Sequence, residues 1–176
     1  LTWGNAANGK LGHGAQMAAG NQTLPRPVKL QVNIIAAACG VEHTVLLSSR
    51  GNIFSMGMGW FGRLGQGKTG NLYIPEQAQG NDLIAKEVHC GANFTALITP
   101  DDELFMCGSH RMCCKPEHQL TFTKFDAIKD GIKLGSPKFI KVSCSESHCL
   151  VVTKDGKAWG WGENENGQLG LGFTSQ

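Results

Sequence analysis

The sequence predicts an all-β protein of four-stranded antiparallel sheets, arranged as the blades of an incomplete propeller ring of three to four blades. Two repeated motifs predict this fold. The glycine-rich frame (Trp/Met)-Gly-x4-Gly-x-Leu-Gly-x-Gly begins at Trp3, Met56 and Trp161. A second motif begins at Cys39, Cys90 and Cys144, at intervals of 51 and 54 residues. Two independent motifs with one shared period indicate a repeat architecture, and periods of this size are typical of propellers and solenoids.

The content of one period favours the propeller. Residues 34–39 are an apolar run, 40–42 a turn, 43–48 a strand, 49–52 a tight turn and 53–56 a further strand. These segments are bounded by turn residues, and none of them is long enough for a helix. Each period therefore predicts a small antiparallel sheet of about four strands, and such sheets placed around an axis make a β-propeller.

The two motifs resemble the repeat of the regulator of chromosome condensation family. The resemblance rests on Cys-Gly-x-x-His-Thr at residues 39–44 and on Trp-Gly-x-Asn-x-x-Gly-Gln-Leu-Gly at residues 161–170. It covers nearly the whole chain and is close over residues 34–67 and 139–172. The resemblance implies a seven-bladed β-propeller with blades of roughly fifty residues.

The 176 residues are predicted to form a single array of about three and a half repeats. We expect a partial blade at 1–33, blades at 34–85 and 86–138, and a partial blade at 139–176. Propellers close with roughly four to eight blades, so this length cannot close a seven-bladed ring alone. Three interpretations stay open: a fragment of a longer protein, which we favour, an open array, or a homodimer that completes one propeller.

Composition narrows the classes of partner. The net charge is +2 and charged residues make up 17% of the chain, so nothing requires a nucleic-acid partner. No segment approaches the ~20 apolar residues that a membrane span needs. Three of the seven cysteines share one repeat position, which predicts small core residues rather than bridge partners. Unbridged cysteines favour a reducing compartment, so the predicted location is nuclear or cytoplasmic.

The third period departs from the frame. After Cys107-Gly108 the expected Gly-x-Leu-Gly is missing, which predicts a loop with a conformation of its own. Residues that could ligate zinc are concentrated here: Cys107, His110, Cys113, Cys114 and His118. One alternative is a loop with incidental thiols, in which Cys107 points into the core. Another is redox sensitivity at the adjacent pair Cys113-Cys114. We predict no metal and no cofactor, and keep Cys107, His110, Cys113 and His118 as the alternative ligand set.

His43 and His148 occupy the same repeat position. A structural interpretation is an imidazole that ties the loop to backbone groups in each blade. The family resemblance implies another, because in the founding member acidic and histidine residues of these loops face a Ran-type small GTPase and displace its nucleotide. By motif position the corresponding residues are Glu42, His43, Asn93, Glu146 and His148, with Phe94 replacing the histidine of the middle copy. Exchange needs no covalent chemistry, so no catalytic residues are predicted.

Trp60 and Phe61 stand where the other copies carry Ala6-Ala7 and Asn164-Glu165. Beside Arg63, this aromatic pair is a candidate contact anchor, since aromatic residues and Arg dominate binding hot spots. The alternative is a pair packed against the neighbouring blade. The remaining tryptophans are predicted to pack in the core or between blades: Trp3, Trp159 and Trp161.

The segment 124–141 has an excess of three positive charges. Its charged residues are Lys124, Asp126, Lys129, Asp130, Lys133, Lys138 and Lys141. A solvated blade edge explains them, because Lys also blunts edge strands. A contact with chromatin or phosphate is the alternative.

Together these observations favour a protein-interaction scaffold built from propeller repeats. The alternative function is a guanine-nucleotide exchange factor for a Ran-type small GTPase, associated with chromatin, and only the family resemblance supports it. A metalloenzyme using the cluster at 107–118 ranks last, because the sequence shows no general base.

Overall fold

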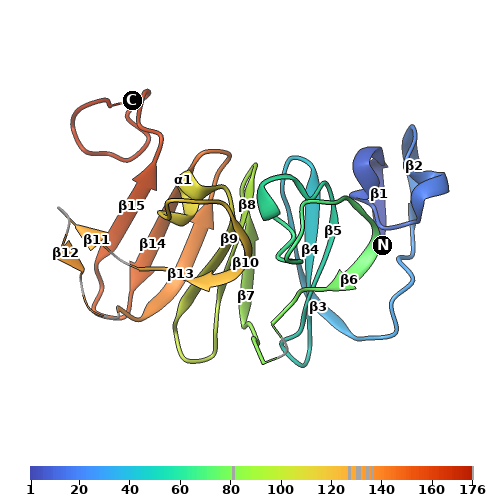
Figure 1. Cartoon of the computed structure of the whole chain (residues 1–176), viewed down its shortest axis with the longest axis horizontal. Coiled ribbons are helices and arrows are strands. Elements are labelled where there is room, and N and C mark those ends of the chain that lie inside the picture. The colour runs from blue at the N-terminus through green and yellow to red at the C-terminus, as the bar shows by residue number, and fades with distance from the viewer. Residues whose placement is uncertain (81, 127, 130–131, 134, 136, 176) are drawn as a thin grey trace.

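The computed structural model describes residues 1–80, 82–126, 128–129, 132–133, 135 and 137–175, and of 128–129 and 132–133 only the backbone. The four sheets that carry the repeat stand side by side along the long axis of the molecule, in the order of the sequence (Figure 1). The predicted all-β architecture is confirmed. Two of these sheets have four strands, and the sheets at the two ends have two and three, as expected of complete and partial blades.

Four sheets carry the repeat, and each pairs strands that are neighbours in sequence. The first sheet contains β1 (Thr2–Asn5) and β2 (Asn21–Arg26). The second contains β3 (Ile34–Cys39), β4 (His43–Ser48), β5 (Ile53–Gly57) and β6 (Leu72–Gln77). The third contains β7 (Glu87–Cys90), β8 (Phe94–Ile98), β9 (Leu104–Gly108) and β10 (Gln119–Lys124). The fourth contains β13 (Phe139–Cys144), β14 (His148–Thr153) and β15 (Ala158–Gly162).

A short hairpin of β11 (Ile128–Lys129) and β12 (Ile132–Lys133) lies between the third and fourth sheets in the chain. It falls within the lysine-rich segment. Asp130 and the side chains of Lys129 and Lys133 lie outside the described residues, so the structure does not test the predicted solvated edge there.

Short helical turns lie between β1 and β2, between β5 and β6, and between β9 and β10. They are η1 (Ala7–Gly9), η2 (Ala15–Met17), η3 (Trp60–Gly62) and α1 (His110–Cys113). The third-period loop forms one α-helical turn, ended by Cys114 in the left-handed conformation at φ 52°, where the earlier loops have a 3-10 turn. Its predicted departure from the repeat conformation is therefore seen.

Adjacent sheets meet in joints, which we number first, second and third along the chain, and the second and third joints have hydrophobic cores. Strand β8 serves two of them because its side chains alternate between its faces. Leu97 belongs to the core of the second joint, together with Val45 and Leu47. Phe94 and Ile98 belong to the core of the third joint. The third sheet is therefore a wall shared by two cores.

Two predictions of burial are wrong. Cys39 is exposed, whereas the matching Cys90 and Cys144 are half-buried. The difference follows from β3, most of which is exposed because the two-stranded first sheet does not cover it. Trp3 is 60% exposed on β1 rather than packed in a core. Trp159 and Trp161 do pack against the core of the third joint, as predicted.

The β8–β9 hairpin turns at Asp102, which has a φ of 62°. Gly51 and Gly156 occupy the same place in the sister hairpins, with φ of 83° and 80°. The Asp102 carboxylate contacts Lys86 and lies 3.7 Å from Lys154, which belongs to the fourth sheet's hairpin. The hydrogen bond from Lys86 lowers the pKa of Asp102.

Candidate functional site

Three turns along one edge of the row of sheets bring most of the predicted partner-binding residues together. They connect β3 to β4, β7 to β8 and β13 to β14, and we call this edge of the molecule the loop end. Each turn accepts a hydrogen bond from the residue that follows the repeated glycine. Met58 donates to the carbonyl of Glu42 at 2.8 Å, Ser109 to Asn93 at 2.9 Å and Glu163 to Ser147 at 2.9 Å.

The repeated glycine makes this approach possible. Gly57 has a φ of 108°, and a Cβ on it would lie 2.5 Å from the carbonyl oxygen of Glu42. Gly108 and Gly162 have the same conformation, and a Cβ on either would collide with the equivalent turn. Only glycine meets both requirements, positive φ and the absence of a side chain. The spacing of the two sequence motifs therefore encodes a contact between two loops.

The same contacts show that the motif match of Glu146 is shifted by one residue. Ser147 occupies the place of Glu42 and Asn93, since its carbonyl accepts the equivalent hydrogen bond. Glu146 stands where the other turns have Val41 and Ala92. It is exposed, and its carbonyl accepts a hydrogen bond from the backbone of Ala92 at 3.2 Å. Glu146 thus belongs to the loop end at a different position of the turn.

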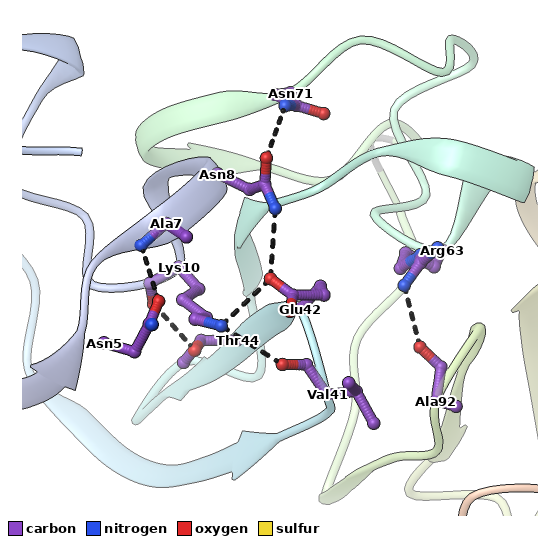
Figure 2. A network of polar contacts seen from close by, with 10 residues as sticks. All are labelled: Asn5, Ala7, Asn8, Lys10, Val41, Glu42, Thr44, Arg63, Asn71 and Ala92. Atoms are coloured by element: carbon purple, nitrogen blue, oxygen red, sulfur yellow. Dashed lines mark hydrogen bonds and ion pairs between the residues drawn. The ribbon is translucent and has the colours of Figure 1, made fainter. Parts of the chain in front are cut away.

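Glu42 is held within the first joint (Figure 2). Its carboxylate pairs with Lys10 at 2.9 Å and accepts a hydrogen bond from the side chain of Asn8 at 3.1 Å. Burial by itself raises the pKa of Glu42, but the hydrogen bonds from Lys10 and Asn8 and the charge of Lys10 outweigh it, so the pKa is lowered. Thr44 completes the link by donating its hydroxyl hydrogen to the carbonyl of Lys10 at 2.8 Å.

The second joint repeats this arrangement with Arg63. Its Nη1 donates to the carbonyl of Ala92 at 2.8 Å, and the hydroxyl of Thr95 donates to the carbonyl of Arg63 at 2.7 Å. Lys10 likewise reaches the carbonyl of Val41, at 3.4 Å. We call this arrangement a latch: the side chain of a loop cation bonds to a carbonyl in a turn of the next sheet, and a Thr hydroxyl of that sheet bonds to the carbonyl of the same cationic residue. The guanidinium of Arg63 is directed into the joint toward Ala92 (Figure 2), and Arg63 is only 3% exposed.

His43 lies behind this second latch. It is 1% exposed, and its Nε2 is 2.9 Å from the hydroxyl oxygen of Thr95. Because that hydroxyl already donates to Arg63, Nε2 carries the hydrogen and donates it. Burial first, and then the charge of Arg63, lower the pKa of His43 to about 3. His43 is therefore a neutral internal group, and Phe94, fully buried, takes its place in the next sheet.

Trp60 and Phe61, in η3, are apolar side chains that the loop end presents to solvent, at 59% and 36% exposure, and Val41 of the β3–β4 turn is 54% exposed. Phe61 has a φ of 63° and stands in the place of Asn8, which has a φ of 59°, so the sequence match with Ala6-Ala7 was displaced by one residue. The ring of Phe61 meets His118 edge-on with centroids 4.9 Å apart, and Arg63 lies 5.6 Å from its centroid. Phe61 therefore joins the loops of the second and third sheets.

The candidate metal ligands separate into two pairs. Cys107 and Cys113 are buried, and the thiol of Cys107 is 3.5 Å from the carbonyl of Arg63. His110 and His118 lie toward solvent, with their Nδ1 atoms 3.4 Å apart. Within the described part of the chain, no three His, Cys, Asp or Glu side chains gather in a way that could hold a metal ion.

The third joint replaces the latch with aromatic contacts. The indole Nε1 of Trp161 donates to the carbonyl of Met112 at 2.8 Å. The ring of Trp161 stacks on Phe125 with centroids 4.5 Å apart. His148 is half-buried and interacts with the hydroxyl of Ser145 in its own turn, whereas His43 bonds to a hydroxyl of the next sheet.

Sequence reasoning missed the latch residues Lys10, Thr44 and Thr95. A signal was present: a cation precedes Leu-Gly in the first two glycine motifs, and Thr follows the His or Phe position in the first two turns. The pairing of these two positions across a joint becomes visible only in three dimensions.

The sheets, joints and repeated loops define a segment of a β-propeller. The model of the Regulator of chromosome condensation (RCC1) repeat matches residues 1–47 and 50–98, and a second model of that repeat matches 139–168. The chain belongs to the regulator of chromosome condensation repeat family. The divergent loop after Gly108 lies outside these matches.

Similar curated proteins have diverse activities. Over 97% of the chain, it is 30% identical to the ultraviolet-B receptor UVR8 of Arabidopsis thaliana, of which it covers 39%. Over 99% it is 28% identical to the human E3 ubiquitin-protein ligase HERC2, of which it covers 4%. Over 97% it is 25% identical to the zebrafish (Danio rerio) serine/threonine-protein kinase Nek8, of which it covers 26%. The chain thus spans well under half the length of these relatives.

Solved structures show the same fold. Prp20p of Saccharomyces cerevisiae, described with its binding to Gsp1p and histones, aligns with a TM-score of 0.77 and 20% identity, covering 98% of this chain and 43% of Prp20p. Yeast RCC1 (Prp20) bound to Kap60 aligns with a TM-score of 0.76 and 20% identity, covering 99% and 42%. None of the helices in the described residues combines the length and the apolar run that a membrane crossing requires.

Proposed function

We propose that this chain is the docking part of a propeller scaffold, and that it binds a protein partner through the loop end around Trp60 and Phe61. One observation carries the proposal: Phe61 adopts a left-handed conformation that Asn8 takes in the sister loop. That conformation costs a side chain like Phe roughly 1–2 kcal/mol, whereas Asn adopts it readily. Backbone strain of this kind concentrates at binding sites, where function maintains it.

The surroundings of the aromatic pair suit a protein interface. Trp60 is largely exposed, and aromatic residues contribute most to binding hot spots. Glu146 is exposed, and Asn93 and His148 are half-buried on the neighbouring turns, so a polar rim adjoins an apolar centre. We leave Glu42, His43 and Arg63 out of the contact surface, because their side chains are committed to the latches.

The relatives support docking rather than a single chemistry. A receptor, a ubiquitin ligase and a kinase share these repeats, and their activities have little in common. A fold used in this way contributes surfaces, while the chemistry resides elsewhere.

The second candidate function is guanine-nucleotide exchange on a Ran-type GTPase. The specific observation that favours it is the likeness to Prp20p, which is described with its binding to Gsp1p, a Ran-like GTPase, and to histones. In this case Asn93, Glu146 and His148 would face the GTPase. The buried His43 would then act only by shaping its turn.

One experiment tests both functions. Ran-type GTPase loaded with fluorescent GDP is mixed with the chain, and complex formation and nucleotide release are measured together. We expect binding that weakens by about tenfold in Trp60→Ala, as for a hot-spot aromatic. Leu24→Ala is the control, because Leu24 is also an exposed apolar residue but lies on β2, away from the loop end.

The outcomes separate the two functions. Binding without faster release supports the scaffold and rejects exchange. Faster release that is lost in Glu146→Ala supports exchange. If neither is seen with the GTPase, the same measurement with core histones tests the chromatin partner, and equal effects of Trp60→Ala and Leu24→Ala on any binding would reject the aromatic anchor.

We further propose a nuclear or cytoplasmic location, consistent with seven free cysteines. The homodimer that completes one propeller is one of the three interpretations that the sequence leaves open. Light scattering decides the point, since a mass of one chain rejects the homodimer.

A further inference from the structure

Two thiols face each other across the first strand pair of the fourth sheet. Cys144 on β13 and Cys149 on β14 are directly opposite in the register, and their sulfur atoms are 3.3 Å apart. The adjacent pair, Ser145 and His148, forms the backbone hydrogen bond at 2.9 Å, so the cysteines occupy a non-hydrogen-bonded position. Opposing Cα atoms at such positions are about 4.5 Å apart, within the range of about 4.4–6.8 Å that a disulfide spans.

The repeat shows that this pair is particular to the fourth sheet. The same register position pairs Cys39 with Thr44 in the second sheet and Cys90 with Thr95 in the third. There the Thr hydroxyl donates across a joint to the carbonyl of Lys10 or Arg63. Cys149 has replaced that Thr, and its hydrogen is directed to the sulfur of Cys144 instead. The substitution removes a latch and creates a dithiol in one step.

The geometry points to Cys144 and Cys149 as a redox-active dithiol that is oxidised to an intrasheet disulfide by a small disulfide such as oxidised glutathione. In a reducing compartment the free dithiol is the resting form. The assignment is independent of the proposed docking function, because it rests on the register and on the sulfur–sulfur contact alone.

The chemistry is two successive thiol–disulfide exchanges. Cys144, the more accessible thiol, loses its proton and attacks one sulfur of oxidised glutathione, which forms a mixed disulfide and releases one glutathione thiolate. Cys149 then loses its proton and attacks the sulfur of Cys144, which releases the second glutathione thiolate. The two protons end on the two glutathione molecules. Two protein thiols are oxidised and one glutathione disulfide is reduced.

The order of the two attacks follows from the surroundings of each sulfur. Cys149 is fully buried, whereas Cys144 is half-buried. The hydrogen bond to Cys144, and then burial, raise the pKa of Cys149, which disfavours its thiolate in the resting form. Formation of the mixed disulfide removes the thiol of Cys144 as a partner. Cys149 is therefore suited to the second, resolving attack.

The bond would close the turn that holds Glu146 and His148. Residues 145–148 lie between the two cysteines, so a disulfide ties both ends of this turn together. The carbonyl of Glu146 also accepts the backbone hydrogen bond from Ala92, which links the turn to the third sheet. Oxidation therefore acts directly on the β13–β14 turn, which is bonded through Glu146 to the β7–β8 turn.

Mass spectrometry of the whole chain tests the assignment. The protein is equilibrated with oxidised glutathione, its free thiols are alkylated, and it is digested with trypsin. Cys144 and Cys149 are the two cysteines of the peptide 142–154, which cleavage after Lys141 and Lys154 releases. We expect this peptide to become two hydrogens lighter and to lose both alkyl groups. Reduced glutathione should restore both alkylation sites.

Cys149→Thr is the decisive variant, because it installs the residue of the sister sheets at that position. It should lose the light peptide and accumulate a glutathione adduct on Cys144, since the resolving thiol is gone. Cys114→Ser, which removes an exposed thiol of the neighbouring loop, should leave the conversion unchanged. The inference is overturned if peptide 142–154 stays doubly alkylated while Cys39 or Cys114 carries glutathione. A cross-link from this peptide to one containing Cys113 would also overturn it.

Discussion

The second and third joints connect adjacent sheets at the loop end through different contacts. The second joint is closed at the loop end by Arg63 and Thr95, which bond to backbone carbonyls and to each other. The third is closed by Trp161, which bonds to the carbonyl of Met112 and stacks on Phe125. The third joint lacks both an equivalent of Arg63 and the Thr, since Cys149 stands at the position of Thr95. The comparison teaches that the two halves of a latch form one unit, so that losing one half frees the other to vary.

The shared wall makes the comparison testable with adjacent residues. Leu97 and Ile98 are both fully buried on β8, but Leu97 faces the second joint and Ile98 the third. We expect Leu97→Ala and Ile98→Ala each to lower the free energy of unfolding by about 3 kcal/mol, because each leaves a cavity in one core. Urea unfolding followed by tryptophan fluorescence measures both.

Leu150→Ala, on the exposed face of β14, is the control and should change stability little. If Leu97→Ala and Ile98→Ala differed from each other by several kcal/mol, the joints would be unequal in strength and the picture of a shared wall would fail.

Removing the Arg63 side chain from the latch of the second joint should give the next largest loss of stability. Arg63→Ala leaves the carbonyl of Ala92 without its charged donor, and we expect a loss of about 2–3 kcal/mol in the free energy of unfolding. Arg50→Ala, in the exposed tight turn of the second sheet, is the matched control. A loss below about 0.5 kcal/mol in urea unfolding would place Arg63 among ordinary surface charges.

His43 predicts a pH dependence specific to the second joint. Its folded pKa of about 3 lies below its ordinary value of 6.5, so protonation favours the unfolded chain. The stability that it contributes is complete above pH 6.5 and is lost as the pH falls toward 3, at up to about 1.4 kcal/mol per pH unit. His43→Gln should remove this part of the slope, measured by urea unfolding between pH 7 and 5.

The slope with pH is the quantity compared, because His43→Gln can also change stability at neutral pH. His118→Gln, at an exposed histidine of the third loop, should leave the slope as it is. An unchanged slope in His43→Gln would mean that His43 is solvated in solution.

The smallest expected effect is a gain in stability rather than a loss. Phe61→Asn restores the residue type of the sister loop in a left-handed conformation, and we expect it to stabilise the chain by about 0.5–1 kcal/mol. Thermal unfolding measures the gain. Phe61→Leu, which keeps an apolar side chain without favouring this conformation, should show none. A loss of stability in Phe61→Asn would mean that the contact with His118 outweighs the strain.

The sequence predicted the repeat, the strands and the loop end, because each depends on short-range signals. Ile34–Cys39 and His43–Ser48 have the predicted limits, since Gly40 and Gly51 mark the turns beside them. It could not predict that Arg63 points inward, or that His43 bonds to a hydroxyl of the next sheet rather than to backbone groups of its own loop. Their burial depends on Thr95, about thirty to fifty residues away, and on the packing of two sheets.

The exposure of Cys39 and Trp3 could not be predicted for a related reason. Both residues follow the repeat pattern, but burial requires a neighbouring sheet on the right face, and the first sheet has two strands. The shifted matches of Glu146 and Phe61 have a different cause. They are errors of alignment, because counting from Cys144 and from the motif glycines already places Ser147 opposite Glu42 and Phe61 opposite Asn8. The hydrogen bond to the carbonyl of Ser147 and the φ of Phe61 agree with that count.

Asp102 has a consequence for the choice of buffer. At the hairpin end opposite the latches, its carboxylate contacts Lys86 and approaches Lys154 of the fourth sheet's hairpin, and these pairs lie close to solvent. Dissolved ions screen such pairs, with a Debye length of about 8 Å at physiological ionic strength, while the buried bonds of Arg63 are shielded from them. Raising the salt concentration should therefore loosen the hairpin end of the third joint and leave the second joint intact. Ionic strength can thus separate, in a single unmodified protein, two contacts that mutagenesis must address one residue at a time.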